Sequence, residues 1–207
     1  MASFIVNGKQ VSCAENKKLI RFLRDDLRLT SVKNGCSEGA CGTCTVVIDG
    51  KAAKACVQQT DRMEGRSVIT CEGLTARERE VYAYVFTEAG AVQCGFCTPG
   101  MVMAAKALLD REPDPTPAQV KDAIRMNICR CTGYKKIEEA ILLAARTFRE
   151  GGEVPKRALK GVVGENLDRV DAPAKALGDA KYADDLYLDG MLYGTAARSA
   201  YPRARVL

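Results

Sequence analysis

The chain has 207 residues, a formal net charge of +5, ten cysteines and no histidine. Without histidine, the chain alone cannot form a Ser-His-Asp or Cys-His catalytic site, or a zinc site that needs imidazole. Its basic residues are spread along the sequence instead of forming a run, which argues against nucleic-acid binding.

The cysteines are the feature that calls for an explanation. The apolar runs are too short to span a bilayer, and the first twenty residues lack the core of a signal peptide, so we expect a cytoplasmic protein and no membrane partner. In a reducing compartment ten cysteines are a poor disulfide framework. Metal binding or redox chemistry is therefore the leading interpretation.

The N-terminal stretch has the pattern of a small α/β unit. "SFIVNGKQVSC" predicts a hairpin that turns at Asn7-Gly8, and "CTVVIDGKAAKAC" predicts a second hairpin that turns at Asp49-Gly50. Between them, "KKLIRFLRDDLRL" predicts a helix. Its apolar face would consist of Leu19, Ile20, Leu23 and Leu27.

The first cysteine set lies within this unit. Its spacing, C-x4-C-x2-C with a more distant fourth cysteine, is the plant-type ferredoxin pattern for a 2Fe-2S cluster. Gly35, Gly39 and Gly42 would let backbone N–H groups approach the negatively charged sulfides. The alternatives are a zinc site or buried free thiols. The set consists of Cys36, Cys41, Cys44 and Cys56.

Four helices are predicted after this unit. Thr75-x-x-Glu78 forms a capping box that begins the first, and Gly100–Leu109 is the second. Thr116 and Gln119 form another capping box, with proline at the first helical position, and Lys135–Glu150 is the fourth helix.

The second cysteine set lies in loops at the ends of these helices, where free N–H groups can point at a metal centre. It combines a C-x2-C with a distant C-x-C in "NICRCTGY". A thioredoxin-like dithiol would need a preceding buried strand, and structural zinc is a second alternative. Two sets in tandem favour two clusters with an electron path between them. This set consists of Cys94, Cys97, Cys129 and Cys131.

The motifs "GCSEGACGTC", "QCGFCTPGM" and "CRCTGY", in this order, resemble the iron–sulfur domains of molybdenum hydroxylases, the xanthine dehydrogenase and aldehyde oxidoreductase family. The sequence around these motifs is most similar to the selenium-dependent xanthine dehydrogenase branch. The resemblance implies an α+β fold in which a β-grasp, ferredoxin-like domain precedes a four-helix-bundle 2Fe-2S domain.

The resemblance also implies roles for single residues. The first set would bind the outer cluster and the second set the inner one. Gln93 matches a glutamine that hydrogen-bonds the pterin of the molybdenum cofactor, and Cys131 matches the ligand that lies against the pterin. The alternative for Gln93 is a helix-end residue bonded to backbone. Cys13 and Cys71 fall outside both sets and are expected to be buried in strands.

The predicted domains are 1–74, ferredoxin-like, and 75–150, helical, followed by a linker over 151–170. Residues 171–207 resemble the start of the molybdenum-binding region, which has a YADD segment followed by a strand. The family commonly has Pro-His-Ala-Arg there, whereas this chain has Arg203 in place of the histidine, so no site is assigned. So short a segment cannot bury a core of its own, and we expect it to pack against further polypeptide.

The predicted function is the electron-transfer part of a molybdenum-dependent oxidoreductase that hydroxylates a purine, another N-heterocycle or an aldehyde. Electrons would pass from the molybdopterin centre through two 2Fe-2S clusters to FAD on a partner subunit or to another acceptor, because the chain has no nucleotide-binding loop. No catalytic residue is assigned, and the chain alone should not hydroxylate substrate. The alternatives are a free-standing ferredoxin-like carrier and a zinc-stabilised interaction protein.

Overall fold

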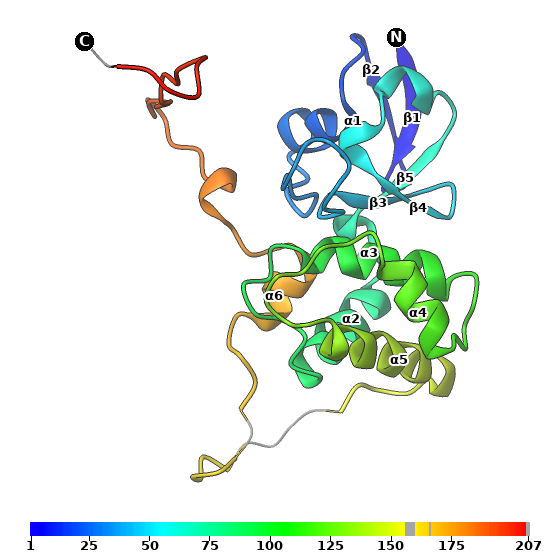
Figure 1. The fold of residues 1–207 in the computed structure, drawn as a ribbon. Helices are drawn as coiled ribbons and strands as arrows, with labels where there is room; N and C mark the ends of the chain where they lie inside the picture. The colour runs from blue at the N-terminus through cyan, green and yellow to red at the C-terminus, as the bar shows by residue number, and fades with distance from the viewer. Residues whose placement is uncertain (156–159, 166, 206–207) are drawn as a thin grey trace.

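The computed structural model describes residues 1–155, 160–165 and 167–205. Within these residues a five-stranded mixed sheet precedes a group of helices, which is the predicted α+β architecture (Figure 1). The strand order is β2-β1-β5-β3-β4. The strands are β1 (Ala2–Val6), β2 (Lys9–Cys13), β3 (Thr45–Ile48), β4 (Lys51–Lys54) and β5 (Ser67–Ile69).

Tight turns connect the outer pairs of strands, and both predicted hairpins are confirmed. β1 pairs antiparallel with β2 across Asn7-Gly8, and β3 pairs antiparallel with β4 across Asp49-Gly50. All four turn residues have positive φ angles, as two-residue hairpin turns require if they are to match the twist of the strands. β5 joins the hairpins, because it runs parallel to β1 and antiparallel to β3.

A helical segment packs its apolar side chains against the strands. It begins as α1 (Leu19–Arg21) and continues as a π-helical turn over Phe22–Asp26, where the Leu27 N–H bonds to the Phe22 carbonyl. The sequence pattern predicts a regular helix, so this wide turn is a difference; it fits one additional residue into the last turn. The predicted face is buried at Leu19, Ile20 and Leu23, and Leu27 packs at its edge.

The four predicted helices follow. Both capping boxes are present, at Thr75 with Glu78 and at Thr116 with Gln119. The second helix begins at Thr98, two residues before the predicted start, because Pro99 is well suited to a first helical turn. The helices are α2 (Ala76–Glu88), α3 (Thr98–Leu109), α4 (Pro117–Ile124) and α5 (Lys135–Glu150).

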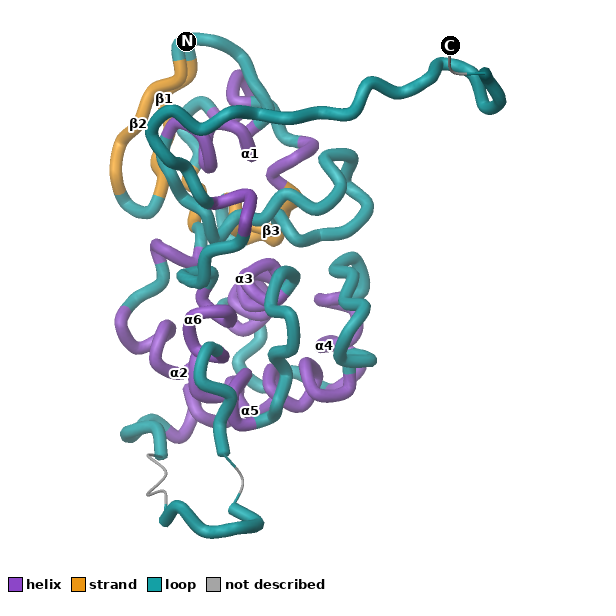
Figure 2. The backbone as a smooth tube through the Cα atoms, turned by 90° about the vertical axis from the view of Figure 1, so that its left-hand side faces the viewer, coloured by secondary structure: helices purple, strands orange, loops and turns teal. Residues whose placement is uncertain are grey.

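Helix α3 is buried along its whole length because other elements surround it (Figure 2). It packs against β3 on one side and against α4, α5 and α6 (Ala172–Leu177) on others. Helix α6 belongs to the C-terminal segment, so the bundle contains one helix more than the sequence predicts. A short helix cannot persist alone, and α6 buries Ala172, Ala176 and Leu177 against this bundle.

The sheet and the bundle meet along a polar contact, here called the seam, made by Gly42, Thr43 and Thr45 with Gly100 and Asn127. The buried Asn127 amide donates to the Gly42 carbonyl at 2.9 Å and lies 3.1 Å from Thr45 Oγ1. A Cβ on Gly100 would lie 2.6 Å from the Gly42 carbonyl oxygen and 2.9 Å from that of Thr43. The helix therefore approaches the cysteine loop more closely than any side chain permits.

The C-terminal part contains little regular structure. In the described residues of the predicted linker 151–170 there is no helix or strand, and after α6 a 3-10 turn covers Ala183–Asp185. The strand expected after the YADD segment is absent from residues 188–205. These residues extend away from the two domains, where no other strand is available to pair with them (Figure 2). Val206 and Leu207, where the sequence continues an apparent strand, lie outside the described residues.

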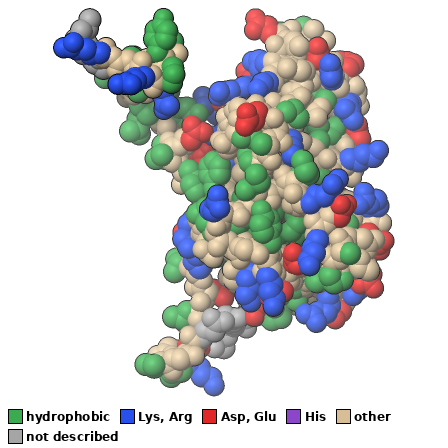
Figure 3. All heavy atoms as spheres, viewed as in Figure 1, with side chains coloured by type: hydrophobic (Ala, Val, Ile, Leu, Met, Phe, Trp, Pro, Cys, Tyr) green, Lys and Arg blue, Asp and Glu red, His purple; other side chains and the backbone are tan. Residues whose placement is uncertain are grey.

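The described residues include no helix long and apolar enough to cross a membrane. Acidic and basic side chains are intermixed over the face drawn in Figure 3, and no large patch of one sign is visible there. This agrees with the even spread of basic residues along the sequence.

The seam generates a first prediction. Gly100→Ala should lower the thermal midpoint of the cluster-loaded protein, although alanine favours helix more than glycine does by about 1 kcal/mol. The added methyl would press on two backbone carbonyls, and such overpacking costs about 1–3 kcal/mol. Gly194→Ala is the control, because a Cβ there meets nothing within 4 Å. Circular dichroism melts measure both; a Gly100→Ala protein as stable as wild type would contradict the close contact.

Candidate metal centres

The first cysteine set forms two pairs of thiols. Cys36 and Cys41 lie in the irregular loop before β3, and the Cys41 N–H points at the Cys36 sulfur at 3.4 Å. Cys44 ends this loop, and its carbonyl accepts from Ala55 N–H at 3.1 Å, which brings Cys56 beside it. Burial, reinforced by the neighbouring Cys56 thiol, raises the pKa of Cys44 to about 12. This set therefore has one partly exposed pair and one buried pair.

The loop around this set directs backbone groups at sulfur. The backbone N–H groups of Glu38 and then Cys41 lower the pKa of the Cys36 thiol to about 6. Gly39 and Gly42 have positive φ angles, which turn the chain tightly enough for this. A Cβ on Gly35 would lie 3.0 Å from the Cys41 sulfur. The loop thus supplies what the sequence predicts: backbone close to sulfur, with donors that favour the thiolate.

The second set also forms two pairs, one exposed and one buried. The Cys94 and Cys131 sulfurs are 3.6 Å apart, and both residues are exposed. Cys97, at the start of α3, and Cys129 are buried. Burial, and then the charge of Cys129, raises the pKa of Cys97.

Local hydrogen bonds hold Cys129 in place. The Tyr134 hydroxyl accepts from the Cys129 N–H at 3.0 Å, and the Thr132 hydroxyl lies 3.1 Å from the Cys129 sulfur. Tyr134 has a positive φ angle of 70°, uncommon for a bulky residue, and it stands just before α5. The backbone turn thus directs the tyrosine ring back toward the cysteine loop.

The paired arrangement fits 2Fe-2S clusters. Such a cluster shares four thiolates between two irons, so each iron needs two neighbouring sulfurs. A structural zinc ion would instead gather all four around one point. The donor set and its backbone cradle therefore suit a two-iron cluster at each site.

A backbone contact links the two sets, and no pattern in the sequence predicts it. The Ile128 N–H donates to the Cys41 carbonyl at 2.8 Å, directly before Cys129 and directly after the seam residue Asn127. The only sequence signal is that an asparagine, a residue rich in hydrogen-bonding groups, immediately precedes "ICRC".

The remaining predicted residues lie as follows. Gln93 is exposed directly before the exposed Cys94. Cys13 is buried at the end of β2, and its thiol donates to the Glu15 carbonyl. Cys71 is also buried, and its thiol faces the Pro99 carbonyl, but it begins a 3-10 turn after β5 instead of lying in a strand. The prediction of its strand position is therefore wrong, because β5 ends at Ile69.

Two domain families match the chain. Residues 6–81 match the family described as the 2Fe-2S iron-sulfur cluster binding domain, and residues 70–142 match the [2Fe-2S] binding domain. The fold and the two sets of thiols thus define a protein with two iron–sulfur domains.

Known proteins narrow this class. The chain is 48% identical over 142 residues to the nicotinate dehydrogenase small FeS subunit of Eubacterium barkeri, covering 67% of this chain and 90% of that one. It is 38% identical over 148 residues to a probable xanthine dehydrogenase subunit of Bacillus subtilis, covering 70% of this chain and 86% of that one. The chain belongs to the molybdenum hydroxylase family, as the small iron–sulfur part of such an oxidoreductase, and its role is electron transfer.

Solved structures of similar proteins agree with this family assignment. The aldehyde oxidoreductase of Desulfovibrio desulfuricans matches 89% of this chain and is itself covered to 22%, with a TM-score of 0.80 and 39% identity. Quinoline 2-oxidoreductase of Pseudomonas putida matches 72% of this chain through a chain covered to 96%, with a TM-score of 0.64 and 37% identity.

Alanine substitutions should distinguish the cysteines that bind a cluster from the two that lie outside both sets. Cys56→Ala should abolish the EPR signal of one reduced 2Fe-2S cluster, and Cys129→Ala that of the other, because each removes one thiolate of a pair. Cys13→Ala and Cys71→Ala are matched controls, since each of these thiols donates to a backbone carbonyl, that of Glu15 or that of Pro99, and neither belongs to a set. Both signals should survive in the controls; loss of either signal there would show that the ligand sets are wrongly drawn.

Proposed function

We propose that this chain holds two 2Fe-2S clusters and passes electrons between a molybdopterin centre and a further acceptor. The observation that carries the proposal is that each set forms two pairs of thiols and that the Cys41 carbonyl bonds to the Ile128 N–H between the sets. The proposed ligands are Cys36, Cys41, Cys44 and Cys56 for one cluster, and Cys94, Cys97, Cys129 and Cys131 for the other.

The bound clusters would supply one-electron redox chemistry, and the protein's own task is to hold and tune them. Cys44, Cys56, Cys97 and Cys129 are buried, so these sides of the two sites exclude water. Backbone N–H groups at Cys36 and the hydroxyl of Thr132 at Cys129 stabilise negative charge on sulfur. Solvent exposure and hydrogen bonds of this kind set the potential of a cluster.

We assign contact with the pterin of the molybdenum cofactor to Gln93 and Cys131. Support comes from exposure: Gln93, Cys94 and Cys131 are all open to solvent, and the Cys94 and Cys131 sulfurs adjoin. A cofactor held by another polypeptide or domain can reach this face, whereas Cys97 and Cys129 are covered by protein.

We propose four parts for the chain: a ferredoxin-like domain over 1–74, a helical domain over 75–150, a linker over 151–170 and the beginning of a molybdenum-binding domain over 171–207. The match to 89% of the chain cannot be accommodated within residues 1–150. It therefore extends past residue 150 and into residues 171–207, and the enzyme that it matches is about four and a half times as long as the matched region, which is 22% of it. This supports a molybdenum-binding partner or continuation.

The substrate class we propose is an N-heterocycle or an aldehyde. The named relatives include nicotinate dehydrogenase, nicotine 6-hydroxylase and isoquinoline 1-oxidoreductase subunits as well as aldehyde oxidoreductase. A purine substrate, the selenium-dependent branch, an FAD-binding partner subunit and a cytoplasmic location stay predictions.

The chain expressed alone and loaded with iron and sulfide should be red-brown and bind about four iron atoms, two for each cluster. It should show two EPR signals on reduction. It should not transfer electrons from purines or aldehydes to a dye, because residues 171–207 would supply only the beginning of the molybdenum-binding domain. Metal analysis and a dye-reduction assay test this, and a colourless protein that binds zinc would overturn the proposed function.

In the assembled enzyme, Gln93→Ala should keep both cluster signals yet slow the reduction of the clusters by substrate, since a contact with the pterin would be lost while all eight thiolates remain. Stopped-flow absorbance measures the rate. Gln10→Ala, which changes the same residue type on β2, is the control and should leave the rate unchanged. Equal rates in both variants would leave Gln93 without a role in electron entry.

A further inference from the structure

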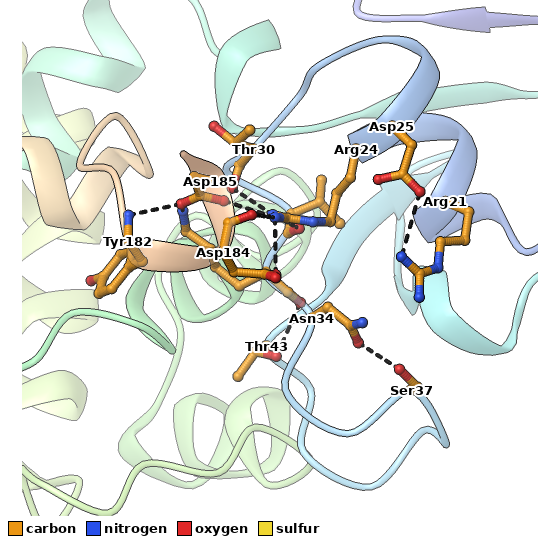
Figure 4. Close-up of polar contacts among 12 residues, drawn as sticks. Arg21, Arg24, Asp25, Thr30, Asn34, Ser37, Thr43, Tyr182, Asp184 and Asp185 are labelled. Carbon is orange, nitrogen blue, oxygen red and sulfur yellow. Dashed lines mark hydrogen bonds and ion pairs between the residues drawn. The ribbon is translucent and has the colours of Figure 1, made fainter. Parts of the chain in front are cut away.

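Residues 171–187, here called the clasp, lie across both halves of the molecule. Helix α6 packs against α2 and α3, and Asp179 pairs with Arg79 of α2 at 2.7 Å. The 3-10 turn that follows reaches the sheet domain instead, beside the loop that precedes the first cysteine set (Figure 4). The clasp thus contacts both domains.

A buried ion pair anchors the clasp to the sheet domain. Asp185 accepts from Arg24 and from Lys33 through separate carboxylate oxygens, each at 2.7 Å. The three side chains are only 2%, 7% and 1% exposed. Arg24 is itself fixed by bonds to the carbonyls of Thr30 and Val32. Burying a charge without a partner is costly, so with the clasp in place the two buried cations need the Asp185 carboxylate.

The clasp also contacts the second cysteine set. The Tyr182 hydroxyl donates to the Cys94 carbonyl at 2.7 Å, and its ring meets Phe96 edge-on at 5.3 Å between centroids. Lys33 Nζ lies 4.7 Å from the centre of the same ring, which joins the tyrosine to the ion pair. Asp185 accepts from the Tyr182 N–H at 3.0 Å, so the acid and the tyrosine are held as one unit (Figure 4).

Close packing matches the clasp to this surface. A Cβ on Gly95 would lie 2.6 Å from the Lys175 side chain, and a Cβ on Gly178 would lie 2.4 Å from the Ser31 Cβ. Two glycines, one on each side of the contact, therefore allow the clasp to lie directly on the loops. Such complementarity on both surfaces is characteristic of a specific interface.

We propose that Arg24, Lys33 and the Cys94–Phe96 loop form the docking surface of the chain's own clasp, which binds there through Asp185 and Tyr182. Docking of the clasp sets the geometry of the Cys94 loop. This deepens the proposed function and rests on it, because Cys94 matters here as a cluster ligand. Asp185 and Tyr182 are positioning residues: the carboxylate holds the clasp, and the hydroxyl holds the loop. The polypeptide after residue 187 is thereby anchored near the face that exposes Cys94 and Cys131.

Hydrogen exchange of the full, cluster-loaded chain tests the anchor. Asp185→Asn should raise amide exchange rates in the clasp and in the Cys94 loop by about tenfold or more, because it leaves two buried cations unpaired. Asp184→Asn is the matched control, since that side chain is 71% exposed and only its 3.3 Å contact to Arg24 is altered. Its rates should stay within about twofold of wild type, as for an exposed pair.

Tyr182→Phe tests the link to the cluster and serves also if Asp185→Asn fails to assemble clusters. The substitution removes the hydrogen bond from the Tyr182 hydroxyl to the Cys94 carbonyl. The reduction potential of the cluster at the second cysteine set, whose EPR signal Cys129→Ala abolishes, should become more negative, and that of the other cluster should stay unchanged. Tyr193→Phe, at an exposed tyrosine, should change neither. Redox titration followed by EPR gives both values.

The outcomes separate two hypotheses. A wild-type chain without two clusters overturns the proposed function. A wild-type chain with both clusters overturns only the docking surface if Asp185→Asn exchanges like Asp184→Asn, if exchange rises in the clasp but not in the Cys94 loop, or if Tyr182→Phe leaves both potentials unchanged.

Discussion

The relation between the two cysteine sets depends on the backbone hydrogen bond from Ile128 to the Cys41 carbonyl. At 2.8 Å it joins the residue before Cys129 to a cysteine of the other set. The bond can form only because Gly42 lacks a Cβ, which would otherwise lie 2.4 Å from the Met126 carbonyl oxygen. A larger residue there would push the bundle from the sheet and separate the two sets. The glycine that shapes one cysteine loop thus also determines how close the other can come.

Neutral and charged contacts have different tasks in this molecule. The seam uses an amide, a hydroxyl and carbonyls, which can be buried together at little cost when all are satisfied. The clasp uses a buried carboxylate between two cations, where loss of one partner is far more costly than the pair itself is worth. Shape and neutral bonds therefore hold the domains together, whereas the clasp depends on one specific anion.

Local structure could be predicted from the sequence because its causes are local. Asn7-Gly8 and Asp49-Gly50 determine their turns, and Thr75 and Thr116 supply their own caps. Contacts between distant segments could not be predicted, because no spacing rule relates Asp185 to Arg24 or Ile128 to Cys41. The prediction of a strand after the YADD segment was wrong for the same reason. A strand needs a neighbouring strand to pair with, and in the described chain none lies beside residues 188–205.

The C-x-C motif places its two cysteines on different sides of the second cysteine set. Cys129 and Cys131 are two residues apart, yet one is buried beside the seam and the other is exposed beside Cys94. Tyr134 and Thr132 hold the inner cysteine, so the chain must turn outward between the two. The second set therefore has an outer side open to a partner and an inner side that continues, through Ile128, to Cys41. This short motif gives the second set two different sides, which fits the proposed entry of electrons at the surface and their exit toward the first set.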